Sequence, residues 1–305
     1  MPDQQVLTWA DISRLPVDGT QVWTIARLAP AVQAALPFGV ITDAEEPASG
    51  QKRVVAIGGG AFLDRVKLWR AESSAETWLC AVASLWGSGA EASPIAVRLE
   101  NGQKVAHMQT TLLPEARAVW PQLATEIPAD LARWGYGDTL AHAIEGFLSP
   151  LGGDDNRAVA GNFLRSRLMP QPLDQSAIWF DLSAEACAIQ ARAGVGLVHG
   201  IAHTLEPQVS GFGHARLCSS FLWPVLRYNV ERGAKVETLC TTHGIAIDAL
   251  DQACRSVFDV GDFRALLPEL EQRWDSVIRH PLSRSNCTTV RRDGIDFFRQ
   301  MEFAV

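Results

Sequence analysis

The chain changes character near residue 128, and this change is what most constrains its fold. Before it, short β-branched segments alternate with turn signals and with helix-forming segments. From Pro128 onward the strand-like segments stop, and stretches with helical periodicity follow one another, separated by prolines. Alternating strands and helices are typical of a parallel α/β sheet, whereas a run of amphipathic helices forms a helical domain. We therefore predict an α/β domain of the nucleotide-binding type over residues 1–126 and an all-helical domain over residues 127–305.

The individual elements follow from the same patterns. The expected strands are 21–26, 38–42, 52–60, 77–83, 94–99 and 116–120, with helices at 28–36 and 61–71 between them. The segment PIAVRLENGQKVAHM, residues 94–108, is typical of a hairpin that turns at Asn101 and Gly102. In the second half, helices are expected at 128–149, 155–169, 183–205, 214–229, 234–243, 246–257 and 262–278.

Charge and composition exclude several classes of protein. The formal net charge is −7 and the sequence has no run of Lys or Arg, so we expect no nucleic-acid partner. No apolar run approaches the roughly 18 residues that a membrane span needs, so we expect no membrane partner. The N-terminus lacks a basic region followed by an apolar segment, and the six cysteines form no disulfide or CxxC pattern. These features favour a cytoplasmic protein.

The segment GYGDTLAHAIEGF, residues 135–147, places polar side chains within an otherwise apolar helix. Asp138 and His142 are four residues apart, so on a helix they share one face. This geometry suits a salt-bridged pair, a proton relay or half of a metal site. The pair alone does not distinguish these alternatives.

A second histidine-rich segment spans residues 194–229. His199 and His203 are again four apart on an expected helix, and His214 follows at the start of the next one. One carboxylate and three neutral imidazoles form a good site for Fe²⁺ or Zn²⁺. Isolated histidines on helices are more often packing or surface residues, so the spacing alone leaves both interpretations open.

Several motifs, taken in order, resemble the iron-containing (group III) alcohol dehydrogenases. In the second half, DTLAHAIEGFLSP, GLVHGIAHTLE and GFGHARLCSSFLWPVLRYN are similar to the family's metal-binding segments. In the first half, VVAIGGGAFLDRVK resembles its phosphate-binding loop, and SLWGSGAEASPIAV resembles a further nucleotide-binding segment. The similarity runs from about residue 53 to 230. It implies the architecture shared by these enzymes and the dehydroquinate synthases, with a metal-binding helical domain.

The resemblance also implies roles for particular residues. It implies four metal ligands, Asp138, His142, His199 and His214. It makes His203 a catalytic candidate, close to the nicotinamide and able to relay a proton, whereas Glu145 is expected to be structural. The implied cofactor contacts are Gly58, Gly59, Gly60, Asp64, Ser84, Ser88, Lys104 and Arg27. Lys67 matches a helix position that we expect at the surface.

The nucleotide half departs from the family pattern in three places. Only some 57 residues precede the triple glycine, so this domain is shortened. The family's Ser after the glycines is Ala61, and its paired threonines are Ser84 and Leu85. The strand at 21–27 ends in Arg27, where the family commonly has an Asp that holds the ribose hydroxyls. Arg27 would favour a 2′-phosphate and therefore NADPH over NADH, or it is simply a solvated charge.

These features predict a metal-dependent, NAD(P)H-linked alcohol dehydrogenase or reductase that acts on a small aldehyde or ketone. The metal would polarise the substrate oxygen while NADPH or NADH in an interdomain cleft delivers hydride to the carbonyl carbon. Two alternatives remain: a non-redox metal enzyme that resembles the sugar phosphate cyclases, and a non-catalytic metal-binding paralogue. The resemblance implies a homodimer.

Overall fold

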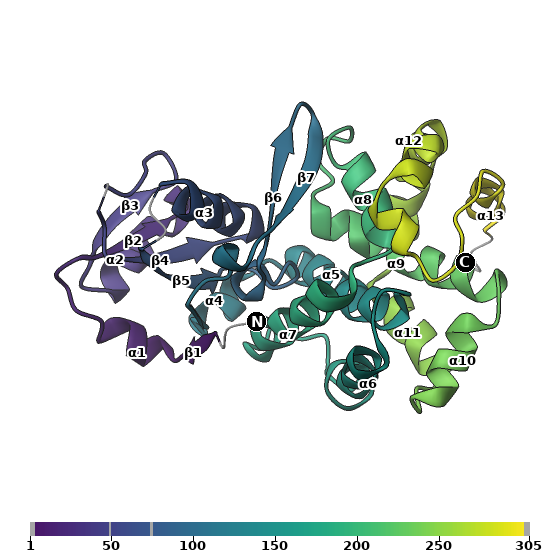
Figure 1. Ribbon diagram of the computed structural model, residues 1–305, viewed down its shortest axis with the longest axis horizontal. Helices are drawn as coiled ribbons and strands as arrows, with labels where there is room; N and C mark the ends of the chain where they lie inside the picture. The colour runs from purple at the N-terminus through teal and green to yellow at the C-terminus, as the bar shows by residue number, and fades with distance from the viewer. Residues whose placement is uncertain (1–3, 49, 74–75, 302–305) are drawn as a thin grey trace. The chain divides into compact units, whose positions relative to one another are not determined.

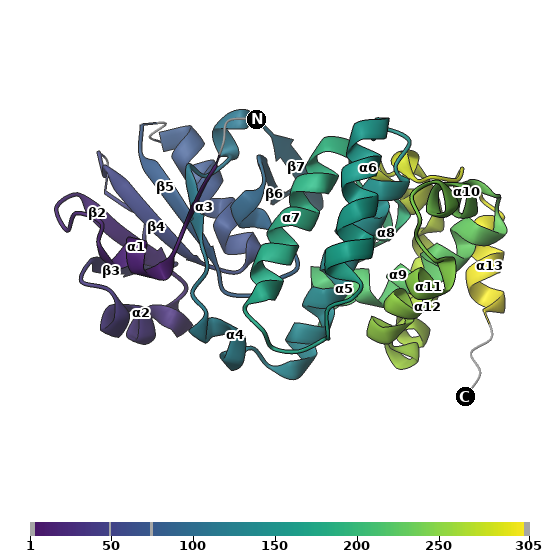
Figure 2. The same ribbon diagram turned by 90° about the horizontal axis from the view of Figure 1, so that it is seen from below.

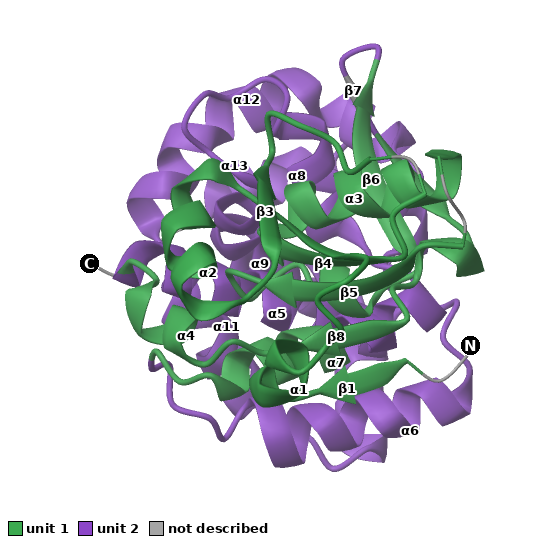
Figure 3. Ribbon diagram, turned by 90° about the vertical axis from the view of Figure 1, so that its left-hand side faces the viewer, with its two compact units in different colours: residues 1–100, 105–128, 175–185 green, residues 101–104, 129–174, 186–305 purple. Residues whose placement is uncertain are grey.

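A computed structural model describes residues 4–48, 50–73 and 76–301 of the chain (Figure 1). The chain forms two compact units, coloured separately in Figure 3. Unit 1 contains residues 1–100, 105–128 and 175–185, and unit 2 contains residues 101–104, 129–174 and 186–305. The main transition along the chain thus falls after Pro128, where the sequence changes character.

Unit 1 is built on a six-stranded sheet in which every pairing is parallel, in the order β1-β8-β5-β4-β2-β3. Its strands are β1 (Gln5–Leu7), β2 (Thr20–Thr24), β3 (Gly39–Thr42), β4 (Arg53–Gly58), β5 (Trp78–Ala83) and β8 (Ala116–Ala118). After its first residue, each of the central strands β4 and β5 is buried throughout, as expected for parallel strands covered on both faces. The predicted parallel α/β sheet is confirmed; the short edge strand β1 carries too weak a pattern to be predicted.

The predicted hairpin is formed by β6 (Ile95–Glu100) and β7 (Gln103–Met108). Its two turn residues, Asn101 and Gly102, have φ of 51° and 77°. Positive φ at both positions defines the type I′ turn that an Asn-Gly pair favours, because its twist matches that of the strands.

Unit 1 also contains helices and short 3₁₀ turns. They are α1 (Trp9–Ser13), α2 (Ala29–Ala35), α3 (Gly60–Ser73) and α4 (Gln122–Glu126), with 3₁₀ turns η1 (Ala26–Leu28), η2 (Ala90–Ala92) and η3 (Thr110–Leu112). Helix α3 packs against β4, β5 and β6. Lys67 on α3 is completely buried, so the expectation of a surface lysine is wrong. Its Nζ lies 2.8 Å from Asp64 Oδ1 and donates to the carbonyl oxygen of Ala90 at 2.9 Å, which joins α3 to the loop after β5.

Unit 2 is helical, as predicted (Figure 2). Its elements are α5 (Ala129–Leu148), α6 (Asp154–Phe163), the π-helical turn η4 (Leu164–Leu168), α8 (Leu197–Leu205), α9 (His214–Glu231), α10 (Lys235–Thr242), α11 (Ile247–Val257), α12 (Val260–Arg279), η5 (Leu282–Ser285) and α13 (Gly294–Gln300). Helix α7 (Ile178–Ala193) begins in unit 1 and continues into unit 2. The predicted single helix 183–205 is wrong, because Gly194 adopts φ of 73° and separates α7 from α8.

Helix α5 forms the centre of unit 2 and packs most extensively against α9. It is buried on all sides from Gly135 to Leu148, which is typical of a core helix. Gly137 allows the close approach of α9, because a Cβ there would lie 2.6 Å from Ser219 Cβ and 2.8 Å from Ser219 Cα. This contact brings Asp138, the next residue on α5, close to His214 at the start of α9. Within the described residues, no helix is both long and apolar enough to cross a membrane.

Candidate functional site

Helix α5 carries the first two predicted ligands, Asp138 and His142. Both are buried, and His142 Nδ1 lies 3.9 Å from Asp138 Oδ1. The carboxylate and imidazole therefore share one helical face, as their spacing of four predicts. From Gly135 to Leu148 every residue of α5 is buried, so both polar groups project from a helix that forms part of the core.

Helices α8 and α9 bring two further imidazoles to the same carboxylate. His199 Nε2 lies 3.6 Å and His214 Nε2 lies 3.9 Å from Asp138 Oδ1. The His142 and His199 rings lie 4.5 Å apart between centroids. In the structure, the imidazoles of His142, His199 and His214 thus all lie within 3.9 Å of one oxygen atom, Asp138 Oδ1.

The free atoms in this cluster fit a divalent metal. Among the described side chains, Asp138 Oδ1 and His199 Nε2 are buried with no hydrogen-bond partner. Buried polar atoms are rarely left unpaired, so such a pair marks a position for another partner. Two nitrogen or oxygen ligands about 2.1 Å from a tetrahedral ion lie about 3.4 Å apart, close to the separation seen here. A carboxylate and imidazoles are ligands that both Fe²⁺ and Zn²⁺ accept.

Carboxylates contact the Nδ1 atoms of two of these histidines and orient their rings. Glu145, on α5, lies 2.7 Å from His199 Nδ1 and also accepts from the Val198 amide at 2.7 Å. Glu206 lies 3.2 Å from His214 Nδ1. A carboxylate on Nδ1 fixes the proton there and leaves Nε2 free to bind a metal. These contacts join different helices, and for that reason sequence spacing could not identify them.

Cys218 is a donor that the sequence motifs did not single out. It lies on α9, four residues after His214, and is completely buried. Its Sγ lies 3.6 Å from His214 Nε2. Four side chains each offer one possible ligand atom, and these atoms all lie within 4.8 Å of one another: Asp138, His199, His214 and Cys218. The His-x-x-x-Cys spacing in GFGHARLC was the available signal. His142 lies beside this group and outside it.

The charges of the cluster are strongly coupled. Burial alone would raise the pKa of Asp138, but His142, His199 and His214 hold that pKa well below its ordinary value. Burial would lower the pKa of His214, but Cys218 and Asp138 raise it to about 10. A metal binds the unprotonated nitrogens and therefore competes with protons for the same lone pairs.

His203, the catalytic candidate, lies one turn beyond His199 on α8. Its ring centroid is 5.1 Å from that of His214 and 5.7 Å from that of His280. Burial, together with the neighbouring histidines and Lys104, lowers the pKa of His203 well below its ordinary value. The imidazole is therefore neutral at pH 7 and is partly exposed.

In unit 1, the triple glycine lies at the junction of a strand and a helix. Gly58 ends β4, and Gly60 begins α3. A Cβ on Gly60 would lie 2.5 Å from Ser88 Oγ, so glycine permits this close approach. The Ser84 amide donates to the Gly58 carbonyl oxygen at 2.9 Å. Gly58, Gly60, Ser84 and Ser88 are thus brought together, and Gly59 has open space at its Cα.

The remaining predicted cofactor residues lie in different settings. Asp64 uses one carboxylate oxygen for Lys67 and accepts from the Val97 amide with the other, at 2.9 Å. Lys104 forms an ion pair with Glu206 in unit 2. Arg27 is exposed on the turn η1, and β2 ends three residues earlier, at Thr24. The expectation that the strand itself ends in Arg27 is therefore wrong.

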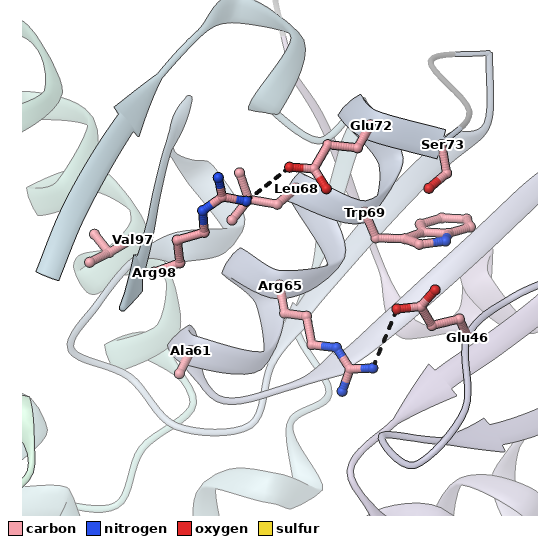
Figure 4. A pocket seen from close by; sticks show the side chains of 9 residues that line it. All are labelled: Glu46, Ala61, Arg65, Leu68, Trp69, Glu72, Ser73, Val97 and Arg98. Atoms are coloured by element: carbon pink, nitrogen blue, oxygen red, sulfur yellow. Dashed lines mark hydrogen bonds and ion pairs between the residues drawn. The ribbon is translucent and has the colours of Figure 1, made fainter. Parts of the chain in front are cut away.

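A cavity of about 410 Å³ lies along α3 and is lined partly by paired charges (Figure 4). Arg98 contacts Glu72 at 2.9 Å, and Arg65 lies 3.7 Å from Glu46. Because both arginines already face carboxylates, the cavity offers no net positive charge to an anionic ligand. Ala61 is the one residue of the glycine-rich junction among those that line it.

No protein-family model matches the chain. The chain is 27% identical over 199 residues to the 1-propanol dehydrogenase PduQ of Salmonella typhimurium, which covers 60% of the chain and 53% of that enzyme. It is 26% identical over 216 residues to the 4-hydroxybutyrate dehydrogenase of Cupriavidus necator. This match covers 60% of the chain and 56% of that enzyme. The matched part therefore spans about half the length of these curated relatives.

Solved structures share the fold over nearly the whole chain. An iron-containing alcohol dehydrogenase from Corynebacterium glutamicum matches with a TM-score of 0.79 and 18% identity, covering 97% of this chain and 94% of that one. The iron-containing alcohol dehydrogenase of Thermococcus thioreducens matches at 0.74 and 17%, covering 97% of each chain. A maleylacetate reductase from Agrobacterium tumefaciens matches with a TM-score of 0.77 and 17% identity. This match covers 97% of this chain and 95% of that one.

The fold is that of the enzymes that combine a parallel α/β unit with a helical, metal-binding unit. Within that class, the motif resemblance to the iron-containing alcohol dehydrogenases is confirmed, and the chain is a relative of these enzymes.

Proposed function

We propose that the protein is a metal-dependent, NAD(P)H-linked alcohol dehydrogenase, or aldehyde and ketone reductase, acting on a small carbonyl substrate. The observation that carries this proposal is the buried donor cluster around Asp138 Oδ1, in a fold that these oxidoreductases share. The names of the curated relatives support alcohols as the substrate class. Asp138 Oδ1 and His199 Nε2 are buried without a hydrogen-bond partner, and a carboxylate oxygen and an imidazole nitrogen are ligands that Fe²⁺ and Zn²⁺ accept.

In this proposal, Asp138, His142, His199 and His214 are the residues available to hold the metal, which when bound supplies a Lewis acid for the substrate oxygen. Glu145 and Glu206 keep two of the imidazoles in the tautomer that binds through Nε2. His203 is neutral, so it holds a proton on one ring nitrogen and accepts one on the other. It is therefore suited to pass a proton between the substrate oxygen and solvent.

The nucleotide is assigned to the start of α3. The first amides of a helix lack intrahelical partners and favour the negative charge of a pyrophosphate. Gly58, Gly59 and Gly60 keep side chains away from these amides. We further propose that Arg27, exposed beyond β2, contacts a 2′-phosphate, so that NADPH is preferred over NADH.

Titration of the metal-loaded protein with NADPH and with NADH, followed by fluorescence, tests the assignment. Saturable binding is expected for both, with tighter binding of NADPH. Arg27→Ala should weaken NADPH binding and leave NADH binding unchanged. Oxidation of 1-propanol and of 4-hydroxybutyrate would then be assayed with the oxidised cofactor. If neither nucleotide binds, the oxidoreductase assignment is wrong. Light scattering in solution tests the homodimer that the family resemblance implies.

A further inference from the structure

We infer that Cys218 is itself a ligand of the metal, so that its sulfur joins Asp138, His199 and His214 in one donor set. This inference rests on the proposed metal site and goes beyond the ligands that the sequence motifs imply. It assigns a sulfur donor to a site otherwise made of oxygen and nitrogen.

The position of the sulfur atom carries the inference. Cys218 Sγ lies 3.6 Å from His214 Nε2, the nitrogen that also lies 3.9 Å from Asp138 Oδ1. With a Zn–S bond of about 2.3 Å and a Zn–N bond of about 2.05 Å, tetrahedral ligands lie about 3.6 Å apart. One donor atom from each of Asp138, His199, His214 and Cys218 lies within 4.8 Å of the other three.

The surroundings of Cys218 differ from those of a packing cysteine. It shares the cluster with Asp138 Oδ1 and His199 Nε2, both buried and both without a hydrogen-bond partner in the described chain. Cys240 and Cys254 are also buried, on α10 and α11. Neither belongs to a group of metal-binding side chains within the described residues.

A sulfur donor has a consequence for the choice of metal. Thiolates are softer ligands than carboxylates and imidazoles, and sets that combine sulfur, nitrogen and oxygen suit Zn²⁺. A site of one oxygen and three imidazole nitrogens accepts Fe²⁺ as readily. Cys218 therefore shifts the preference of this protein toward Zn²⁺, in contrast to the iron named for its structural relatives.

Cobalt substitution of the full chain tests the inference without reference to activity. The Co²⁺-loaded wild type should show visible bands of a four-coordinate ion and, in addition, a near-ultraviolet sulfur-to-cobalt charge-transfer band. Cys218→Ser keeps the size of the side chain and should lose the charge-transfer band while it still binds Co²⁺. Cys254→Ser, a buried cysteine outside the cluster, should keep the band.

X-ray absorption of the Zn²⁺-loaded wild type gives a second readout that needs no variant. A sulfur scatterer at about 2.3 Å from zinc is expected. One bound metal per chain without sulfur scattering or a charge-transfer band would overturn the role of Cys218 and leave the metal site intact. If the wild type binds neither Co²⁺ nor Zn²⁺, the proposed metal site itself fails.

Discussion

Replacing Glu145 with Gln tests how this protein prepares His199 for a metal. Glu145 is buried, and its two oxygens face two donors: His199 Nδ1 at 2.7 Å and the Val198 amide at 2.7 Å. A Gln side chain offers one acceptor and one donor. Whichever way its amide is turned, it satisfies one of the two neighbours and presents a donor to the other.

The variant therefore has two unfavourable outcomes for metal binding. Either His199 moves its proton to Nε2 and loses the lone pair that faces Asp138, or a buried amide of α8 loses its acceptor. Loss of such an orienting carboxylate lowers metal affinity about 10- to 100-fold. This loss corresponds to about 1.4 to 2.7 kcal/mol of binding free energy.

Competition with a fluorescent chelator measures the affinity directly. Glu206→Gln should have a smaller effect, below about tenfold, because Glu206 is more exposed and its contact with His214 is 3.2 Å long. Glu237→Gln, exposed on α10, is the control and should change nothing. Wild-type affinity in the Glu145→Gln protein would show that Glu145 does not control the tautomer of His199.

Three further changes test other parts of the structure. Lys67→Met leaves Asp64 without its buried cation and should lower the free energy of unfolding, measured with denaturant, by about 3–5 kcal/mol. The control Arg98→Met removes one partner of an exposed ion pair and should lower it by under about 1 kcal/mol. Gly60→Ala should weaken NADPH binding in a fluorescence titration by displacing Ser88. Asp259 caps α12, and hydrogen bonds lower its pKa, so it stabilises the fold above its unfolded pKa and this contribution is lost as pH falls. Asp259→Ala should therefore lower stability at pH 7, by about 0.5–2 kcal/mol, and lose this difference in acid.

Much of the fold could be predicted because local patterns and topology agree. The β-branched segments before residue 120 form parallel strands, except for the segment at 94–99, which forms the hairpin whose Asn101-Gly102 pair adopts a type I′ turn. The break between α7 and α8 was missed because it depends on one left-handed residue, Gly194, within a helix-forming composition. Lys67 was misplaced because its burial depends on carbonyl groups that the loop after β5 presents, far along the chain.

In the candidate site, too, contacts within one helix could be predicted from the sequence, whereas contacts between helices could not. Spacing of four on a helix predicts that Asp138 lies beside His142, and the motif resemblance adds His199 and His214, whose Nε2 atoms lie 3.6 and 3.9 Å from the same carboxylate oxygen. Spacing cannot show which atom of one helix faces which atom of another. For this reason the sequence predicts only a structural role for Glu145, whereas in the structure its carboxylate contacts His199.

We expect the metal cluster to support nucleotide-linked oxidation and reduction. The test is NADPH-dependent reduction of small aldehydes, assayed after a chelator has removed the metal and again as metal is added back. We expect activity to disappear and then to return in proportion to metal, reaching its limit at one ion per chain, while Asp138→Asn recovers none. Activity that survives chelation, or an Asp138→Asn variant that keeps one tightly bound metal and full turnover, would contradict the account.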